Sequence, residues 1–414
     1  MANALVDWLT QEMQTVLSRP QVVTRHAASR VSAGAAPAFT RQIAEQLVAE
    51  ALQHGLSAGR QKIEHESLGG GNTADHVGRL HTSLPFAFKM DANSRKLAEE
   101  ALTIRAIKNN KLLPDLFRDA WPTVFAVRTE APYAYLMEYF PKDEGWVSLE
   151  DRLYPKSDGA PISQADVLRW TTRILDVLFS GLESSVDRRL LPNLEEDYVS
   201  RIKDRLESAA KRDDRFQSQH LEINGQRLKP WREYVAILDR RRDSILAMTP
   251  RFSTIVHGDP NPGNMMLNVT SAEVAVRLID PKEWHWGDYL FDVAKLTHFL
   301  QHTGPIEKPA QGAPAPSVTY SKTGDGARFD HSYAIPLWTD RAVTMCLERA
   351  GQFAKQHDDT QWQMRYRLGM ASNLLGLPIG RLTHKTNPKP DSAMILYCEG
   401  LIWLDLFCKH WEDA

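Results

Sequence analysis

HGDPNPGN, at residues 257–264, is the stretch from which the fold of this chain can be read, and Asp280 follows it sixteen residues after Asn264. Asp259 supplies a carboxylate that can accept a proton from an attacking hydroxyl. The side-chain oxygens of Asn264 and Asp280 are hard ligands of the kind that Mg²⁺ prefers. Phosphoryl transfer from a metal-bound nucleotide requires a base and two metal ligands at such a spacing, so the motif predicts that class of reaction.

The loop and the residues after it predict a defined local structure. Its glycines permit sharp turns and its prolines restrict the backbone. Apolar runs at Met265–Leu267 and Val274–Ile279 predict a β-hairpin whose second strand brings Asp280 to the same cavity. In the alternative interpretation, Asp259 and Asn264 only cap a tight turn, as such residues often do. That alternative leaves the spacing of Asp280 unexplained.

The composition is that of an ordinary globular protein long enough for two lobes. The 414 residues are 43% hydrophobic and 25% charged, and the formal net charge is -2. This balance does not predict binding to nucleic acid or to an anionic membrane. The three cysteines are an odd number without metal-ligand spacing, which indicates buried thiols in a reducing compartment rather than disulfides or a zinc site.

The amino-terminal sequence carries acidic residues and lacks the apolar core of a secretory signal. No segment reaches the roughly 20 apolar residues that a membrane-spanning helix needs. We therefore expect a cytoplasmic protein without a membrane segment. The sequence gives no indication of the oligomeric state.

Three regions are expected along the chain. Residues 1–60 predict a helical N-terminal extension, because apolar residues between Ile43 and Leu52 recur at helix spacing. Residues 61–140 predict a nucleotide-binding lobe, with strands at 62–68, 75–81 and 84–90 in an antiparallel sheet and a helix at Arg95–Ile107. Residues 141–414 predict a larger, mainly helical lobe that holds the catalytic loop and the acceptor site.

Within the larger lobe, helices are predicted over residues 163–250, over Tyr289–Leu300 and toward the carboxyl end. The prolines and glycines of residues 303–328 predict a long loop, either mobile or serving as a lid.

Several residues of the smaller lobe are candidates for contact with a nucleotide. The turn Gly69-Gly70-Gly71-Asn72 could wrap its backbone N–H groups around a phosphate, although adjacent glycines also mark ordinary hairpin turns. Lys89 lies in an apolar run, where an ammonium group needs an anionic partner such as a phosphate. Glu100, in the helix that follows, could hold Lys89 in place. Either Glu100 or Glu99 could instead simply favour the positive end of that helix.

These motifs resemble those of the aminoglycoside phosphotransferase and choline kinase family, distant relatives of the protein kinases. The resemblance is specific at residues 256–296, VHGDPNPGNMML through LIDPKEWHWGDYLFDVAKL, and looser at residues 64–140. It implies an α+β, bilobal protein-kinase-like fold. The N-lobe would be a small antiparallel β-sheet with a helix, and the C-lobe would be larger and mainly helical.

The resemblance also implies roles for individual residues. Asp259 would be the catalytic base, Asn264 and Asp280 would bind magnesium, and Lys89 would contact the nucleotide phosphates with Glu100 as its partner.

Two further residues would support the catalytic loop. Asp292 would be a buried acid that braces the loop, and His257 would be part of that brace. Pro281 departs from the pattern, because the better-known members carry an aromatic residue after the metal-binding aspartate. This departure weakens any direct link to antibiotic resistance.

The run Tyr135–Phe140 ends where the composition becomes polar. A two-lobed kinase crosses between its lobes at such a point and offers backbone groups, here those of Glu138, Tyr139 and Phe140, to the adenine edge. An edge strand that enters a loop fits the sequence nearly as well.

We hypothesise ATP-dependent, or GTP-dependent, phosphorylation of a small-molecule hydroxyl with Mg²⁺, the acceptor being a sugar, an amino sugar or an amino alcohol. Candidate acceptor contacts are Glu283, Trp284, Trp286 and Asp288, since indole rings stack on sugars and cations and carboxylates attract amines. Ordinary packing of the two tryptophans is an equal alternative.

Two other functions are weighed. A protein kinase is disfavoured because the loop reads HGDxxxxN instead of an HRD-type sequence, and Pro281 stands where Phe-Gly would follow. A catalytically silent nucleotide-binding module is disfavoured because Lys89, Asp259, Asn264 and Asp280 are all present.

Overall fold

The chain forms two compact units, which are described separately. Unit 1 comprises Met1–Trp146 and Arg277–Trp284, and unit 2 comprises Val147–Val276 and His285–Ala414. The computed structural model describes residues 22–25, 43–44, 46–48, 50–51, 63–69, 76–81, 86–155, 162–282, 286–324 and 326–411. Asp280 therefore belongs to unit 1, whereas the loop 257–264 belongs to unit 2.

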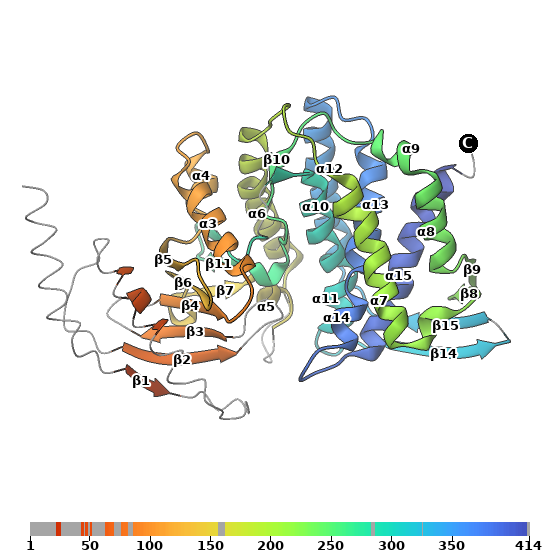
Figure 1. Cartoon of the computed structure of the whole chain (residues 1–414), viewed down its shortest axis with the longest axis horizontal. Helices are drawn as coiled ribbons and strands as arrows, with labels where there is room; N and C mark the ends of the chain where they lie inside the picture. Colours follow the sequence, from red (N-terminus) through yellow and green to blue (C-terminus); the bar gives the residue numbers. More distant parts are fainter. Residues whose placement is uncertain are drawn as a thin grey trace, which may run out of the picture. The chain divides into compact units, whose positions relative to one another are not determined.

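Unit 1 contains a six-stranded sheet in the order β1-β2-β3-β4-β6-β5. Its strands are β1 (Val22–Arg25), β2 (Ile63–Gly69), β3 (His76–His81), β4 (Phe86–Asp91), β5 (Val124–Arg128) and β6 (Tyr133–Glu138), shown in Figure 1. The pairs from β2 through β5 are antiparallel, as expected from the sequence.

Strand β1 corrects the expectation of an all-helical N-terminal extension. It pairs in parallel with β2, with Val22 opposite Ile63. Its sequence, Val-Val-Thr-Arg, is rich in β-branched residues, which favour strands when a neighbouring strand supplies hydrogen bonds. Because β2 lies about forty residues further along the chain, local periodicity could not indicate this pairing.

The two faces of the sheet carry different neighbours because side chains alternate along a strand. Phe86, Phe88 and Met90 of β4 form one apolar cluster with helical residues that include Ile43 and Leu47. Helix α3 (Lys96–Asn109) packs on β4, β5 and β6 and buries residues that recur every three or four positions. The intervening residues of β4, including Lys89, therefore lie on the opposite face from the cluster.

Unit 2 is mainly helical. Its longer helices are α6 (Gln164–Ser184), α7 (Arg201–Arg212), α8 (Trp231–Arg240), α10 (Tyr289–His298), α12 (Thr339–Gln356), α13 (Trp362–Leu375) and α15 (Pro390–Cys408). Helix α13 packs against both α10 and α15 and is buried along most of its length. The fold class expected from the sequence, α+β with a small sheet-and-helix unit and a larger helical unit, is confirmed.

Shorter segments complete the two units. They are α4 (Asp115–Arg118) in unit 1 and α5 (Leu149–Leu153), α9 (Arg242–Leu246), α11 (Gly304–Glu307) and α14 (Pro378–Leu382) in unit 2. Within the described part of the chain, no helix has both the length and the hydrophobicity needed to cross a bilayer. The three cysteines are buried thiols in α12 and α15.

The expected hairpin after the loop is present. It consists of β11 (Met265–Val269) and β12 (Val274–Leu278), which form a three-stranded sheet in the order β12-β11-β7 with β7 (Trp146–Ser148). A two-stranded ladder of β10 (Thr254–Ile255) and β13 (Trp286–Gly287) lies close to the loop in sequence.

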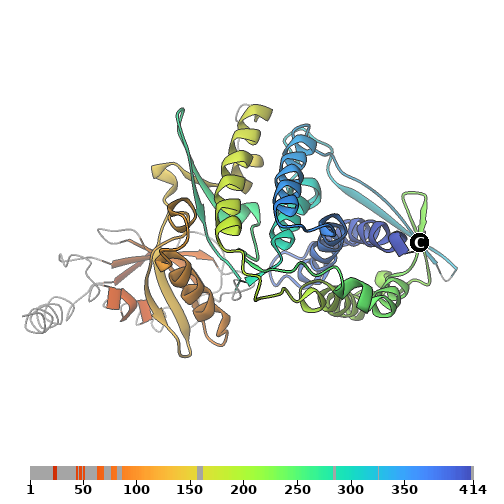
Figure 2. The same ribbon diagram turned by 90° about the horizontal axis from the view of Figure 1, so that it is seen from above.

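A four-stranded sheet in unit 2 contradicts two sequence expectations. Its order is β14-β15-β8-β9, with β8 (His220–Ile223), β9 (Gln226–Leu228), β14 (Ser317–Thr323) and β15 (Gly326–Ser332), and Figures 1 and 2 show β14 and β15 as a cyan hairpin. Residues 163–250 are therefore not helical throughout, and residues 303–328 are not one long loop, because they contain α11, β14 and the start of β15.

Physical reasons for both errors are visible in the sequence. Asn224-Gly225 turns the chain between β8 and β9 with φ values of 48° and 79°, the left-handed conformation that these residues favour in tight hairpins. Pro305 is tolerated because it stands in the first turn of α11. Buried Phe329 anchors β15, and β15 pairs in parallel with β8, about a hundred residues earlier.

Candidate functional site

Lys89 is at the centre of a buried polar cluster in unit 1. It lies opposite Tyr135 in the β4–β6 ladder, and its ammonium nitrogen is 2.7 Å from Oε1 of Glu100 on α3. The same nitrogen forms an ion pair with Asp280. The hydroxyl of Tyr135 donates to Oε1 of Glu100. Glu100, not Glu99, is thus the glutamate that pairs with Lys89, whereas Glu99 pairs with Arg95.

Burial alone would lower the pKa of Lys89, but the charges of Asp280, Glu100 and Tyr135 outweigh it and raise that pKa well above its usual value. Burial raises the pKa of Glu100, and the charge of Lys89 opposes that rise. The lysine is therefore held in its charged form, which is the form that a phosphate contact requires.

Asp280 follows β12 in a left-handed backbone conformation, with φ of 59°. Aspartate tolerates this conformation better than most residues do, and such conformations often occur at functional sites. From this position the carboxylate of Asp280 forms the ion pair with Lys89.

The proposed nucleotide contacts are only partly within the described residues. Gly69 ends β2 opposite Val77, next to a register irregularity, while Gly70, Gly71 and Asn72 lie outside the described residues.

At the end of β6, the backbone N–H of Glu138 donates to the Thr123 carbonyl, and the Glu138 carboxylate accepts from the Thr123 N–H. The backbone N–H of Glu138 therefore already has a hydrogen-bond acceptor within unit 1. Tyr139 and Phe140 lie beyond the strand end, and the Phe140 ring packs on Trp146 with centroids 5.2 Å apart.

In unit 2, a buried carboxylate holds the backbone of the HGDPNPGN loop. Asp292 on α10 accepts hydrogen bonds from the backbone N–H groups of His257, at 2.7 Å, and Gly258, at 2.8 Å. Gly258 has φ of 76°, a conformation that costs glycine little. The backbone N–H of Asp259 donates to Nδ1 of His257 at 3.3 Å. The loop is therefore fixed directly before Asp259.

Asn264 is held through one end of its amide. Its Nδ2 donates to the backbone carbonyl of Asp259 at 2.9 Å, within a short 3₁₀ turn that starts at Pro262. In this orientation the side-chain oxygen is the end that can face a cation. The carboxamide oxygen of Asn264 and the carboxylate of Asp280 are chemically suited to magnesium.

Lys295 is a site residue that the sequence analysis missed. It lies on α10, is only 5% exposed, and places its ammonium nitrogen 3.2 Å from Oδ1 of Asp259. Burial lowers its pKa, and the charge of Asp259 opposes that change. The sequence does carry a signal for Lys295. This lysine stands in the middle of the apolar run that forms α10, and such a position normally excludes a charged side chain.

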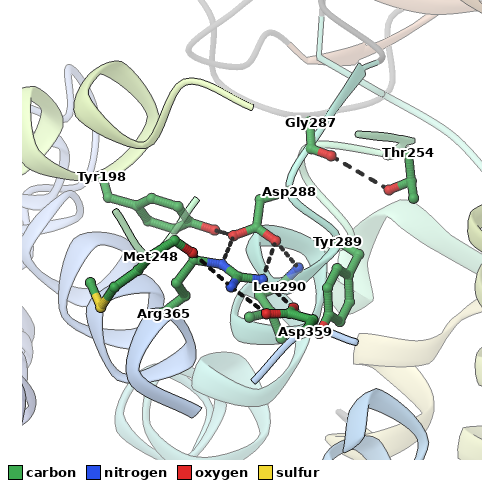
Figure 3. Close-up of polar contacts among 9 residues, drawn as sticks. All are labelled: Tyr198, Met248, Thr254, Gly287, Asp288, Tyr289, Leu290, Asp359 and Arg365. Atoms are coloured by element: carbon green, nitrogen blue, oxygen red, sulfur yellow. Dashed lines mark hydrogen bonds and ion pairs between the residues drawn. The ribbon is translucent and has the colours of Figure 1, made fainter. Parts of the chain in front are cut away.

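Two of the expected acceptor contacts can be placed, and one is contradicted. Asp288 is only 1% exposed and faces the interior of unit 2, where Nε of Arg365 lies 2.9 Å from its Oδ2 and the Tyr198 hydroxyl 3.0 Å away (Figure 3). Asp288 also caps α10 by accepting from the Leu290 N–H. Its carboxylate is therefore committed to a structural network and cannot attract an acceptor amine.

Trp286 is half-buried in β13, opposite Ile255. Glu283 and Trp284 lie outside the described residues.

Comparison with known protein families indicates the class of protein to which the site residues point. Residues 122–315 match the model of the phosphotransferase enzyme family. The matched segment contains the loop, Asp280, Asp292 and Lys295. Over this segment the chain is similar to that family, and the resemblance seen in its motif is confirmed.

Solved structures of small-molecule kinases are also similar to the chain. A thermostable mutant of aminoglycoside phosphotransferase APH(4)-Ia is 12% identical with a TM-score of 0.48, covering 85% of this chain and 97% of that one. The ethanolamine kinase of Plasmodium vivax is 10% identical with a TM-score of 0.47, covering 94% and 93%. A microcompartment-associated aminopropanol kinase is 11% identical with a TM-score of 0.45, covering 90% and 98%. Among curated protein sequences, none matches this chain.

Proposed function

We propose that this phosphotransferase moves the terminal phosphoryl group of ATP, or of GTP, to a hydroxyl group of a small molecule, with Mg²⁺. The observation that carries the proposal is the fixed catalytic loop of unit 2. Asp292 holds the backbone on the amino side of Asp259, and Lys295 pairs with the Asp259 carboxylate. A carboxylate held in this way can orient an acceptor hydroxyl and accept its proton.

The other roles follow the motif. Asn264 and Asp280 would hold magnesium, which when bound neutralises negative charge on the phosphates. Lys89, positioned by Glu100, would contact the phosphates together with the turn Gly69-Gly70-Gly71-Asn72. Tyr139 and Phe140 are the better candidates for adenine contact, because the N–H of Glu138 is already engaged by Thr123.

The acceptor is proposed to be a sugar, an amino sugar or an amino alcohol, which is consistent with the aminoglycoside, ethanolamine and aminopropanol named for the similar structures. Glu283, Trp284 and Trp286 remain proposed acceptor contacts, and Asp288 does not. We also propose that the protein acts in the cytoplasm, given its predicted thiols and balanced charge.

A pooled-acceptor assay tests the proposal. The purified full chain is incubated with Mg²⁺ and ATP or GTP and with pools of hydroxylated metabolites, and mass spectrometry detects the gain of one phosphoryl group. Chelation of Mg²⁺ is expected to abolish the product. Phosphate incorporated into proteins but into no metabolite would favour a protein kinase. Nucleotide binding without transfer to any acceptor would favour a silent module.

A further inference from the structure

Strand β14 is an edge strand whose outer side has no partner strand in the described part of the chain. It ends the four-stranded sheet β14-β15-β8-β9 of unit 2, where its neighbour is β15 (Figure 1). Six of its seven residues are exposed. The outer side of an edge strand presents backbone N–H and C=O groups to which a further strand can bind.

Two hydrogen bonds show which backbone groups of β15 point away from β14. The Phe329 carbonyl accepts from the backbone N–H of Asn224, and the His331 N–H donates to the Asn224 side chain. Asn224 directly follows β8, the strand on the other side of β15. Because backbone groups alternate in direction along a strand, Arg328 and Asp330 direct theirs to β14.

The register then gives the direction of the backbone groups of β14. Arg328 lies opposite Ser321, and Asp330 lies opposite Thr319. Ser321 and Thr319 therefore direct their backbone groups to β15. The alternate residues of β14 direct their N–H and C=O groups to the outer edge, and these residues are Val318, Tyr320 and Lys322.

The outer edge of β14 is complementary to itself, because its three outward residues are symmetric about Tyr320. If a second copy of β14 runs antiparallel to the first, Tyr320 lies opposite its counterpart and Val318 lies opposite Lys322 of the other copy. Every outward N–H of one strand then meets an outward C=O of the other. An interface in which one surface meets the same surface of a second copy closes as a two-fold dimer.

The side chains of β14 are compatible with this pairing. One face of the strand carries hydroxyl side chains alone, which are Ser317, Thr319, Ser321 and Thr323. On the other face, Val318 packs on a buried apolar cluster of unit 2, and the Tyr320 ring lies 5.2 Å from the Phe329 ring. Lys322 is the one charged residue of the strand. Antiparallel pairing places it about 13 Å along the strand from its counterpart, beyond the screening length at physiological salt.

We infer that β14 pairs with β14 of a second copy of this chain, so that the two four-stranded sheets become one continuous sheet in a homodimer. The inference is independent of the proposed phosphoryl transfer. Natural edge strands are commonly protected by proline, by several charges or by a bulge. β14 has no proline and a single lysine, and its pairing with β15 runs without a register shift. Its edge is therefore open to another strand.

Sedimentation velocity of the full chain tests the inference. A seven-residue edge buries less surface than a standard interface, so we expect a reversible dimer with a dissociation constant of about 1–100 μM. Tyr320→Lys and Tyr320→Glu each place like charges directly opposite one another. Each substitution should raise the dissociation constant at least about 10-fold.

An equimolar mixture of Tyr320→Lys and Tyr320→Glu should dimerise again, because opposite charges then meet across the two-fold axis. Leu112→Lys serves as the control. It adds a charge at an exposed position of unit 1 and should keep the wild-type dissociation constant. Circular dichroism shows whether each variant is folded.

Cysteine substitutions test the register. Tyr320→Cys brings two Cα atoms to about 5.5 Å, which a disulfide can span, whereas Lys322→Cys places the two thiols beyond its reach. Mild oxidation should therefore link Tyr320→Cys into dimers on non-reducing gels and leave Lys322→Cys unlinked. The native cysteines are buried and do not compete.

Several results would overturn the inference. A wild-type chain that stays monomeric at about 300 μM, above the expected dissociation constant, would leave the edge of β14 to a strand from a different protein. A dimer that Tyr320→Lys and Tyr320→Glu both leave unchanged, or that their mixture does not restore, would exclude pairing about Tyr320. Equal cross-linking of the two cysteine variants would do the same. If either charged variant is unfolded, the cysteine variants decide.

Discussion

Lys295 places its ammonium nitrogen 3.2 Å from the Oδ1 of Asp259, although burial in unit 2 disfavours its charged form. The pair joins α10 to the HGDPNPGN loop, and Asp292 on the same helix holds the backbone of that loop. One helix thus controls both the path of the loop and the surroundings of its carboxylate. A buried lysine kept at a cost to stability is typical of a functional position.

Replacing Lys295 should therefore separate activity from stability. Lys295→Met removes an ammonium group whose burial is unfavourable, so the melting temperature is expected to stay the same or rise. The Asp259 carboxylate loses its positioning partner, and kcat is expected to fall about 10- to 100-fold. Differential scanning calorimetry and steady-state kinetics measure the two effects. A variant that loses stability and keeps full kcat would show that Lys295 is only structural.

Asp259→Asn tests the candidate base. The amide keeps the shape of the side chain but cannot accept the proton, so turnover should fall about 100- to 10,000-fold while the KM for ATP changes little. Asp204→Asn, at an exposed position on α7, serves as the matched control. Turnover within a factor of about two or three of the wild-type value would contradict the assignment of Asp259 as the base.

The Arg365 network is expected to determine the stability of unit 2. Arg365 is buried between Asp288 and Asp359, and Nη2 lies 2.5 Å from Oδ2 of Asp359 (Figure 3). Arg365→Met leaves two buried carboxylates without their cation, which should cost about 3–5 kcal/mol of unfolding free energy. Arg367→Met, at an exposed position on the same helix, should cost less than about 1 kcal/mol. Urea denaturation of both variants gives the comparison.

His302 is expected to make the stability of unit 2 depend on pH. Its Nε2 accepts from the Trp403 indole N–H at 3.0 Å, and its Nδ1 contacts the Tyr333 hydroxyl at 2.7 Å, an arrangement that fits the neutral ring. Burial, followed by the charge of His331, lowers the pKa of His302 from 6.5 to about 3. Between these values the unfolded chain binds a proton that the folded chain does not, so stability falls as the pH drops below 6.5.

His302→Gln removes this linkage. Between neutral pH and about pH 5, the wild type is expected to lose about 2 kcal/mol more unfolding free energy than the variant. His410→Gln, at an exposed position, is expected to keep the wild-type dependence. Denaturation curves at several pH values measure the difference, and identical slopes for wild type and His302→Gln would contradict the assignment of a neutral buried ring.

The HGDPNPGN loop and the strands of unit 1 could be predicted from the sequence because their signals are local. The spacing of glycines, prolines and polar residues at 257–264 specifies the loop, and alternation of side chains specifies β2, β3 and β4. The pair Asn224-Gly225 is also a typical hairpin signal. The charged sequence on either side of this pair favoured the prediction of a helix instead.

What the sequence by itself determined was the class of chemistry and the order of the main elements, because both depend on residues within one loop, strand or helix. Only the tertiary structure decided which charged residues meet. Asp288 turns inward because Arg365, 77 residues away in sequence, supplies its counter-ion. Lys295 meets Asp259 because α10 packs beside the loop in unit 2, and such contacts between distant residues leave no periodic signal in the sequence.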